Sequence, residues 1–396
     1  MFSHPIYILA ILIFIEGCIL YFSTHRATEK FFKYLPSMFW IYFLPMLAGT
    51  FGIIPNASPV YGAITKWCLP ASLVLLLLSV DIKAILHLGK TALAMMAVGA
   101  VGIMVGAPIV VLIYKRWLPP DAWMGIGTLS ASWIGGSANM IAVKAATNTP
   151  DSVFLPAVIV DTIVPYLWMG LLIMLSAYQA VFDRWNKSNV KLLDELHARA
   201  AANALKNGTV ARPKRSAAVI LFIFTIVIAS SVISVVLAKN LPAVEGLVNA
   251  KAWIIILATF IGIGLSFTPL RRLESHGSSR IGFAMLYFVL ASIGATANLA
   301  TLAAAPVLLL AGITWIIIHG IFLIIGARLL RSPMALAAAA SQACVGGTAS
   351  APAVAGIYQP QLAPVGLLLA VLGNILGTFL GLCTSHLCHL ANNFVW

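Results

Sequence analysis

The chain has 396 residues, of which 61% are hydrophobic and only 9% are charged. A soluble globular protein carries roughly 25% charged residues, because water must solvate its surface. The composition therefore argues against a soluble enzyme or a disordered protein and predicts an all-α polytopic membrane protein. The net charge of +13 does not indicate a nucleic-acid partner, because the lysines and arginines gather in a few short loops, as is usual for membrane proteins.

A helix that crosses the hydrocarbon core needs about 20 apolar residues. Twelve segments meet or nearly meet this condition: residues 5–22, 37–54, 64–80, 91–114, 122–146, 152–179, 217–238, 251–268, 281–298, 303–327, 334–356 and 360–388. The first lacks a preceding basic stretch and an A-x-A cleavage site, so we expect it to be retained as a span. The five cysteines include no CxxC pair, so they predict neither a disulfide framework nor a metal site.

The longest polar stretch, residues 180–216, divides the chain into two halves and contains eight lysines and arginines. We interpret it as a cytoplasmic basic linker. It is either a solvated connection or a short amphipathic helix on the membrane surface, because leucines recur in it at helical spacing. The predicted organisation is a first membrane repeat over 1–179, this linker, and a second membrane repeat over 217–396.

The two halves resemble each other around a pair of glycines. SASWIGGSANMIAV (130–143) aligns with SQACVGGTASAPAV (341–354). The glycine pairs occupy equivalent positions: Gly135 and Gly136 in the first half, Gly346 and Gly347 in the second. The segment that follows each motif also aligns approximately, which places Asp161 near the position of Asn374. Six segments in the same order in each half are typical of secondary transporters built from repeats.

Charge counting predicts the orientation. If the two glycine segments enter and leave the membrane on one side, ten spans cross, the N-terminus lies outside, and 18 of the 24 lysines and arginines are cytoplasmic. The alternative, with all twelve segments crossing and the N-terminus inside, makes 16 cytoplasmic. The first model makes the halves antiparallel, so we favour two six-segment inverted repeats with broken or re-entrant helices. It leaves six basic residues outside: Lys66, Lys115, Arg116, Lys144, Lys239 and Lys251.

Each glycine pair predicts a helix that is broken within the membrane. Glycine, serine and asparagine are poor helix formers, and the backbone groups that a break frees must be satisfied by protein or by water in a cavity. The half-helices after the breaks would direct their positive dipole ends at an anion, while hydroxyls and carbonyls suit Na⁺. The alternative is that the small residues only allow close helix packing. The candidate binding residues are Gly135, Gly136, Ser137 and Asn139 in the first copy, and Gln342, Gly346, Gly347, Thr348 and Ser350 in the second.

Hydroxyl and amide side chains next to the breaks are also candidate helix caps. The candidates are Ser137 or Asn139 in the first copy and Thr348 or Ser350 in the second. Pro352 is expected in the first turn of the second half-helix, where its missing N–H would have no partner anyway.

Two of the eleven acidic residues, Glu16 and Asp161, lie within apolar runs. A carboxyl group at the membrane centre costs about 2.5–3.5 kcal/mol on insertion scales, so it normally faces a cavity or a partner. Asp161 follows the first break by one segment and could bind H⁺ or Na⁺ there; the alternative is a structural, hydrogen-bonded acid. Asn374 would be an uncharged ligand at the equivalent position. Lys144 could either attract an anionic solute or extend to the interface.

The sequence contains no HExxH, GxSxG or CxxC motif and no P-loop with GK[ST]. We therefore expect no enzyme and no catalytic residues. The only expected cofactor is a coupling ion, Na⁺ or H⁺.

Three motifs carry a resemblance to a known family. SWIGGSANM (132–140), VDTIVPYLWMG (160–170) and SQACVGGTASAPAVA (341–355) resemble the membrane protein family catalogued as domain of unknown function 819, over nearly the whole chain. The resemblance implies a multi-pass protein of the bacterial inner or plasma membrane type. More distantly, the chain is similar to the folds of sodium–proton antiporters and of glutamate– or bile-acid–sodium symporters, which have paired repeats and broken helices. Such a likeness of fold does not by itself fix the function.

These observations predict a secondary active transporter, coupled to H⁺ or Na⁺, of a small organic anion or amino-acid-like solute. The solute would bind at the midplane between the two broken helices, Asp161 would hold the ion, and one bundle would rock against the other. The alternatives are a cation–proton antiporter and a non-transporting membrane scaffold or receptor. The expected partners are the lipid bilayer and the solute, and the sequence leaves a homodimer open.

Overall fold

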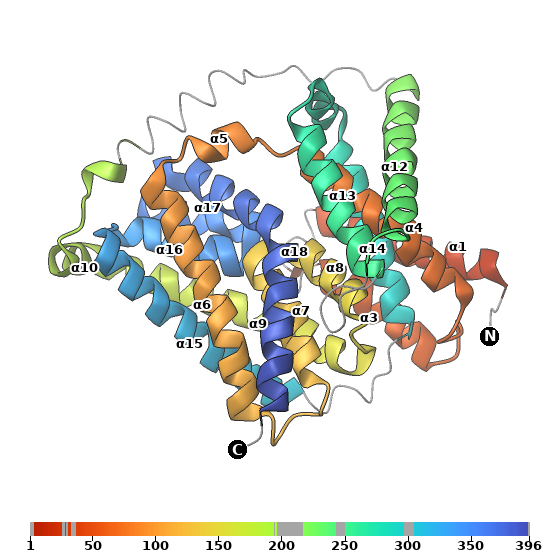
Figure 1. The fold of residues 1–396 in the computed structure, drawn as a ribbon, viewed down its shortest axis with the longest axis horizontal. Helices are drawn as coiled ribbons and strands as arrows, with labels where there is room; N and C mark the ends of the chain where they lie inside the picture. The colour runs from red at the N-terminus through yellow and green to blue at the C-terminus, as the bar shows by residue number, and fades with distance from the viewer. Residues whose placement is uncertain are drawn as a thin grey trace. The chain divides into compact units, whose positions relative to one another are not determined.

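The computed structural model describes residues 4–25, 28, 31–32, 37–193, 195, 217–242, 250–296 and 305–394. Every regular element among these residues is a helix (Figure 1). Eight of the described helices are long and apolar enough to cross a membrane, which confirms the predicted all-α polytopic architecture. They are Pro5–Thr24, Pro59–Leu78, Lys90–Tyr114, Asp151–Asn186, Ala218–Ala238, Ser278–Thr296, Pro306–Leu330 and Pro360–Asn393.

The chain divides into two compact units, and each takes parts from both predicted repeats. Unit 1 comprises Met1–Ser79, Lys144–Thr162 and Lys214–Pro306, and unit 2 comprises Val80–Val143, Ile163–Pro213 and Val307–Trp396. The first part of each half therefore belongs to unit 1 and the last part to unit 2. The inverted relation between the two halves stays a prediction.

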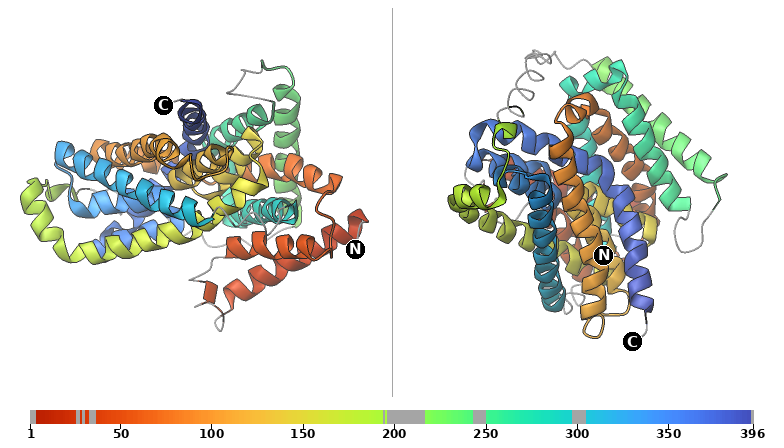
Figure 2. Two further views of the ribbon diagram at one scale, coloured as in Figure 1. Left: turned by 90° about the horizontal axis from the view of Figure 1, so that it is seen from below. Right: turned by 60° about the vertical axis from the view of Figure 1, so that its left-hand side comes forward.

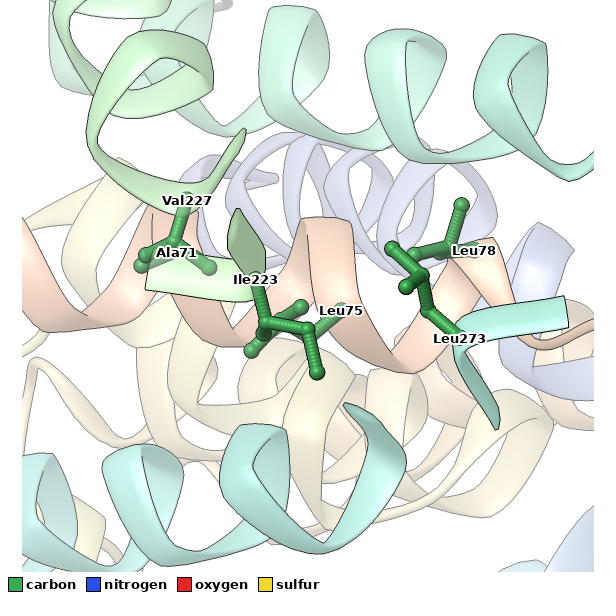
Figure 3. Close-up of a cluster of buried hydrophobic side chains, with 6 residues drawn as sticks. All are labelled: Ala71, Leu75, Leu78, Ile223, Val227 and Leu273. Carbon is green, nitrogen blue, oxygen red and sulfur yellow. The ribbon is translucent and has the colours of Figure 1, made fainter. Parts of the chain in front are cut away.

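Unit 1 is built around a central helix, α4. Its elements are α1 (Pro5–Thr24), α3 (Ser37–Thr50), α4 (Pro59–Leu78), α12 (Ala217–Ala238), α13 (Ala250–Ser266), the 3₁₀ turn η2 (Pro269–His276), α14 (Ser278–Thr296) and the beginning of α9 (Asp151–Leu175). Helix α4 packs against α12, α13 and α14. One buried apolar cluster joins α4 to α12 and η2 (Figure 3): Ala71, Leu75 and Leu78 of α4, Ile223 and Val227 of α12, and Leu273 of η2.

The residues that meet in this cluster bear on the topology. Leu75 lies near the end of α4 and clusters with Ile223, which lies near the beginning of α12, while Val227 follows along α12 beside Ala71 (Figure 3). The two helices therefore run in opposite directions. The ten-crossing model gives them opposite directions, whereas the twelve-crossing model makes them parallel. The number of crossings and the re-entry of the glycine segments stay predictions.

Unit 2 is built around α18. Its elements are α5 (Ile82–Leu86), α6 (Lys90–Tyr114), α7 (Ala122–Gly135), most of α8 (Ser137–Thr147), the end of α9, η1 (Ser176–Tyr178), α10 (Gln179–Asn186), nearly all of α15 (Ala305–Leu330), α16 (Met334–Val345), α17 (Gly347–Tyr358), η4 (Pro360–Leu362) and α18 (Ala363–Asn393). Helix α18 lies along α7 and also packs against α6, α16 and α17 (Figures 1 and 2).

Glycines allow α18 to approach α7 closely. Gly373, Gly377 and Gly381 recur every four residues, so they share one face of α18. A Cβ atom added at Gly377 would lie 2.7 Å from the Cα of Gly135, which leaves no space for a side chain. The same helix reaches α17, because a Cβ at Gly366 would lie 2.7 Å from the carbonyl oxygen of Ala351. One helix thus contacts both segments that contain a glycine pair.

The beginning of the predicted linker is helical and docks within unit 2. The side-chain amide of Asn186 is buried and donates to the carbonyls of Ala327 and Ser332 at 3.1 and 2.9 Å. Asp183 accepts a hydrogen bond of 2.9 Å from the backbone N–H of Met334. Its carboxylate therefore caps α16 from a distant segment, where it also complements the helix dipole. Residues 194 and 196–216, with most of the predicted amphipathic stretch, lie outside the described residues.

Candidate solute-binding site at the paired helix breaks

The first glycine segment is divided at Gly136. Helix α7 ends at Gly135 and α8 begins at Ser137. Gly136 has φ 82° and ψ 173°, a conformation that residues with a Cβ rarely adopt. Its N–H still donates to Ser132 at 2.6 Å, and its carbonyl accepts from the N–H of Asn139 at 3.0 Å. A single residue therefore ends one helix and starts the next.

The second glycine segment is divided at the equivalent place. Helix α16 ends at Val345, α17 begins at Gly347, and Gly347 has φ 62°. Pro352 lies inside α17, so the expectation that it occupies the first turn is wrong. Because proline has no N–H, Pro352 cannot supply the usual i+4 donor to the carbonyl of Thr348. That carbonyl adds an acceptor beside the break.

The side-chain caps expected at the second break do not form. Thr348 and Ser350 lie inside α17, which has no side-chain cap hydrogen bond. The hydroxyl of Ser350 instead accepts a hydrogen bond of 2.8 Å from the amide of Gln342. Since Gln342 belongs to α16, this bond connects the two half-helices across the break.

Asn139 makes the corresponding connection at the first break. Its Nδ2 donates back to the carbonyl of Gly135 and, at 3.2 Å, to the carbonyl of Asn374 on α18. Its Oδ1 accepts from the hydroxyl of Thr378. A break leaves the last carbonyls of the preceding helix unpaired, and this buried amide satisfies one of them rather than capping α8. In the sequence alignment Asn139 is equivalent to Ser350, so equivalent positions bridge both breaks.

The breaks form polar, partly exposed points between buried stretches. Residues 131–135 and 341–345 are buried, whereas 136–138 and 346–348 are partly exposed. Asn374 lies at the first break, because a Cβ at Gly136 would be 3.4 Å from its Oδ1. Helix α7 also contacts α16 and α17. Unit 2 contains ten of the eleven candidate residues: Gly135, Gly136, Ser137, Asn139, Gln342, Gly346, Gly347, Thr348, Ser350 and Asn374.

The remaining candidate, Asp161, belongs to unit 1. It is partly buried on α9, the long helix that contributes residues to both units. Its proposed place beside the first break therefore stays a prediction. Lys144, at the end of α8, forms an ion pair of 2.8 Å with Asp151 and lies 5.2 Å from the centre of the Phe154 ring.

A network of hydrogen bonds lies next to the second break, and the sequence did not predict it. His319 is fully buried, and its Nδ1 lies 3.0 Å from the carbonyl of Gly99. Since a carbonyl only accepts, Nδ1 carries the proton and Nε2 is an acceptor. The Ser341 hydroxyl then donates to Nε2 at 3.0 Å and accepts from the indole N–H of Trp168 at 2.8 Å. This hydrogen-bond network holds α6, α9 and α15 against α16, just before the break between α16 and α17.

Ser341→Ala is expected to lower the free energy of unfolding by about 1–3 kcal/mol, because it leaves a partly buried indole donor and a buried imidazole acceptor without partners. Denaturation in detergent checks this. Ser234→Ala is the matched control: the Ser234 hydroxyl is equally buried but donates to the carbonyl of Ser230, which is in its own helix. Equal losses of unfolding free energy in the two variants would contradict this hydrogen-bond network.

Comparisons with known proteins agree with the motif resemblance. A family model described as "Protein of unknown function (DUF819)" matches residues 10–390, which include both breaks and α9. Over 344 residues, the chain is 25% identical to a protein of Bacillus subtilis (strain 168) that is described as uncharacterized membrane protein YjcL. The aligned part covers 83% of this chain and 85% of that relative.

Proposed function

Because the chain belongs to the DUF819 family and is a multi-pass membrane protein, we propose that it is a secondary active transporter of a small organic anion or amino-acid-like solute. The pair of helix breaks in unit 2 carries this proposal. Irregular backbone is tolerated within a membrane only where protein or a water-filled cavity satisfies it. In secondary transporters, discontinuous helices of this kind hold the solute and the coupling ion.

The two breaks offer complementary groups to such a solute. The first backbone N–H groups of α8 and α17, at the positive ends of the helix dipoles, suit a carboxylate. The hydroxyls of Ser137 and Thr348 and the carbonyl of Thr348 suit an ammonium group or Na⁺. Asn139 and Gln342 hold the two breaks in shape through the bonds described above. The proposal needs no catalytic residue, and it places the protein in the plasma membrane of its cell.

The proposal assigns the coupling ion to Asp161. A carboxyl group within the apolar helix α9 can alternate between ion-bound and neutral forms. Uptake into proteoliposomes would be measured for labelled amino acids and labelled di- and tricarboxylates, under a Na⁺ gradient and under a pH gradient. We expect one gradient to drive uptake and Asp161→Asn to abolish that dependence without loss of folded protein.

Asp121→Asn is the control, because Asp121 is an exposed acid in the turn before α7. Gradient-driven uptake that survives Asp161→Asn unchanged would contradict the assignment of the ion site. Proton movement driven by a cation gradient alone, with no uptake of any organic solute, would identify a cation–proton antiporter and contradict the proposed solute transport.

A further inference from the structure

Unit 1 contains a cavity of about 600 Å³ that three lysines line. Lys66 comes from the first half of α4, Lys144 from the end of α8, and Lys251 from the first turn of α13. Among the described residues that line the cavity there is no aspartate or glutamate. The volume is within the range of about 300–1,000 Å³ that is usual for small-molecule sites.

Neighbouring residues fix two of these lysines. The Lys251 ammonium donates to the Oδ1 of Asn148 at 2.7 Å, and Asn148 takes the left-handed conformation, φ 54°, in the turn between α8 and α9. Lys144 pairs with Asp151, whose other carboxylate oxygen accepts from Thr296 at 2.6 Å. Asp151 therefore compensates one of the three charges. The third lysine, Lys66, lies over the ring of its neighbour Trp67.

Among the described residues that line the cavity, Lys66 and Lys251 therefore have no carboxylate to compensate their charges. Much of the wall is apolar, with Leu69, Ile255 and Ile293 among the lining residues, and apolar walls strengthen the field within a cleft. Positive charges that line the same cavity favour the binding of an anion there. Hydroxyl groups of Thr65 and Ser292 add hydrogen-bonding partners.

The location of these lysines is unusual for a membrane protein. The ten-crossing model leaves only six basic residues outside, and Lys66, Lys144 and Lys251 are three of them. The positive-inside rule disfavours short outer loops rich in lysine. Their gathering in one cavity gives these exceptions a common explanation in ligand binding.

We propose that this cavity is a binding site for a small organic anion that carries two or more negative charges on carboxylate or phosphate groups. Lys66 and Lys251 supply the charge, and the apolar wall receives the carbon skeleton. The site requires binding only, so it does not depend on the proposed transport activity.

The test measures binding to the purified full chain, by calorimetry and by thermal shift, since a ligand that binds the native state raises its stability. The probes are citrate, succinate and glycerol 3-phosphate, in neutral detergent and in nanodiscs of phosphatidylcholine. The variant Lys66→Gln/Lys251→Gln keeps the Lys144–Asp151 ion pair. We expect this variant to bind the tightest-binding probe with an affinity lower by about tenfold or more.

The matched control is Arg116→Gln/Lys239→Gln, which removes two charges from the same predicted side of the membrane but not from the cavity. Its affinity is expected to equal that of the unmodified chain. Equal weakening in both variants, or no binding of any probe by the folded protein, would overturn the proposal. Stabilisation by phosphatidylglycerol nanodiscs alone, with none from the soluble anions, would also overturn it in favour of a lipid headgroup.

Discussion

Asn139→Ala is expected to abolish solute uptake and to lower the free energy of unfolding by about 1–3 kcal/mol. The side chain is buried, and it joins the carbonyls of Gly135 and Asn374 to the hydroxyl of Thr378. Alanine would leave these groups without their partner at the point where α7 ends. The break would then lose the contact that fixes it to α18, so the N–H groups of α8 would no longer present a defined site.

Uptake into proteoliposomes and denaturation in detergent check this prediction together. Asn240→Ala is the matched control, because Asn240 is an exposed amide after α12 whose side chain bonds at 3.4 Å to the carbonyl of Val236. It should retain uptake and stability. Full uptake by Asn139→Ala would show that the bridging amide is not needed for the solute site.

Gly377→Ala is expected to destabilise the protein by about 1–3 kcal/mol, because added atoms in a tightly packed interface force the backbones apart. The new Cβ would lie 2.7 Å from both the Cα of Gly135 and the Nδ2 of Asn139. In an open helix position the same change stabilises by roughly 0.5–1 kcal/mol. The sign of the change in stability therefore distinguishes a glycine in a close helix contact from a glycine in an open helix position.

Gly264→Ala provides the control for that sign, since a Cβ at Gly264 meets no atom within 4 Å. Both variants would be compared by their unfolding in mixed micelles and by uptake. We expect Gly264→Ala to be neutral or slightly stabilising and to transport normally. A Gly377→Ala protein that is as stable as Gly264→Ala would contradict the packing of α18 on α7.

The sequence predicted where the helices are interrupted, because glycine pairs beside serine, threonine and asparagine disfavour a continuous helix. The helix caps that it predicted at Thr348 and Ser350 do not form. Thr348 and Ser350 suit caps by residue type, but Ser350 bonds to Gln342 across the break. That choice depends on how the two half-helices meet, which local preference does not determine.

Contacts between distant segments were beyond the sequence. Asp183 reads as a loop acid of the linker, yet it caps α16 across 151 residues of chain. The lysines of the cavity come from three separate helices, so no motif connects them. The count of basic residues gave one indication, because it showed which lysines lie on the predicted outer side, where lysines are disfavoured. Only the folded structure shows that three of them line one cavity.

Whether water reaches the two breaks decides between a solute-binding site and a sealed packing contact. In a variant with all five cysteines replaced, Ser137→Cys and Thr348→Cys would each be exposed to a membrane-impermeant thiol reagent in proteoliposomes, with Ser72→Cys, fully buried in α4, as the control. We expect both break positions to react and the control to stay unlabelled. Unreactive thiols at both breaks, from either side of the membrane and in folded protein, would show that the breaks are sealed packing points and that no solute binds there.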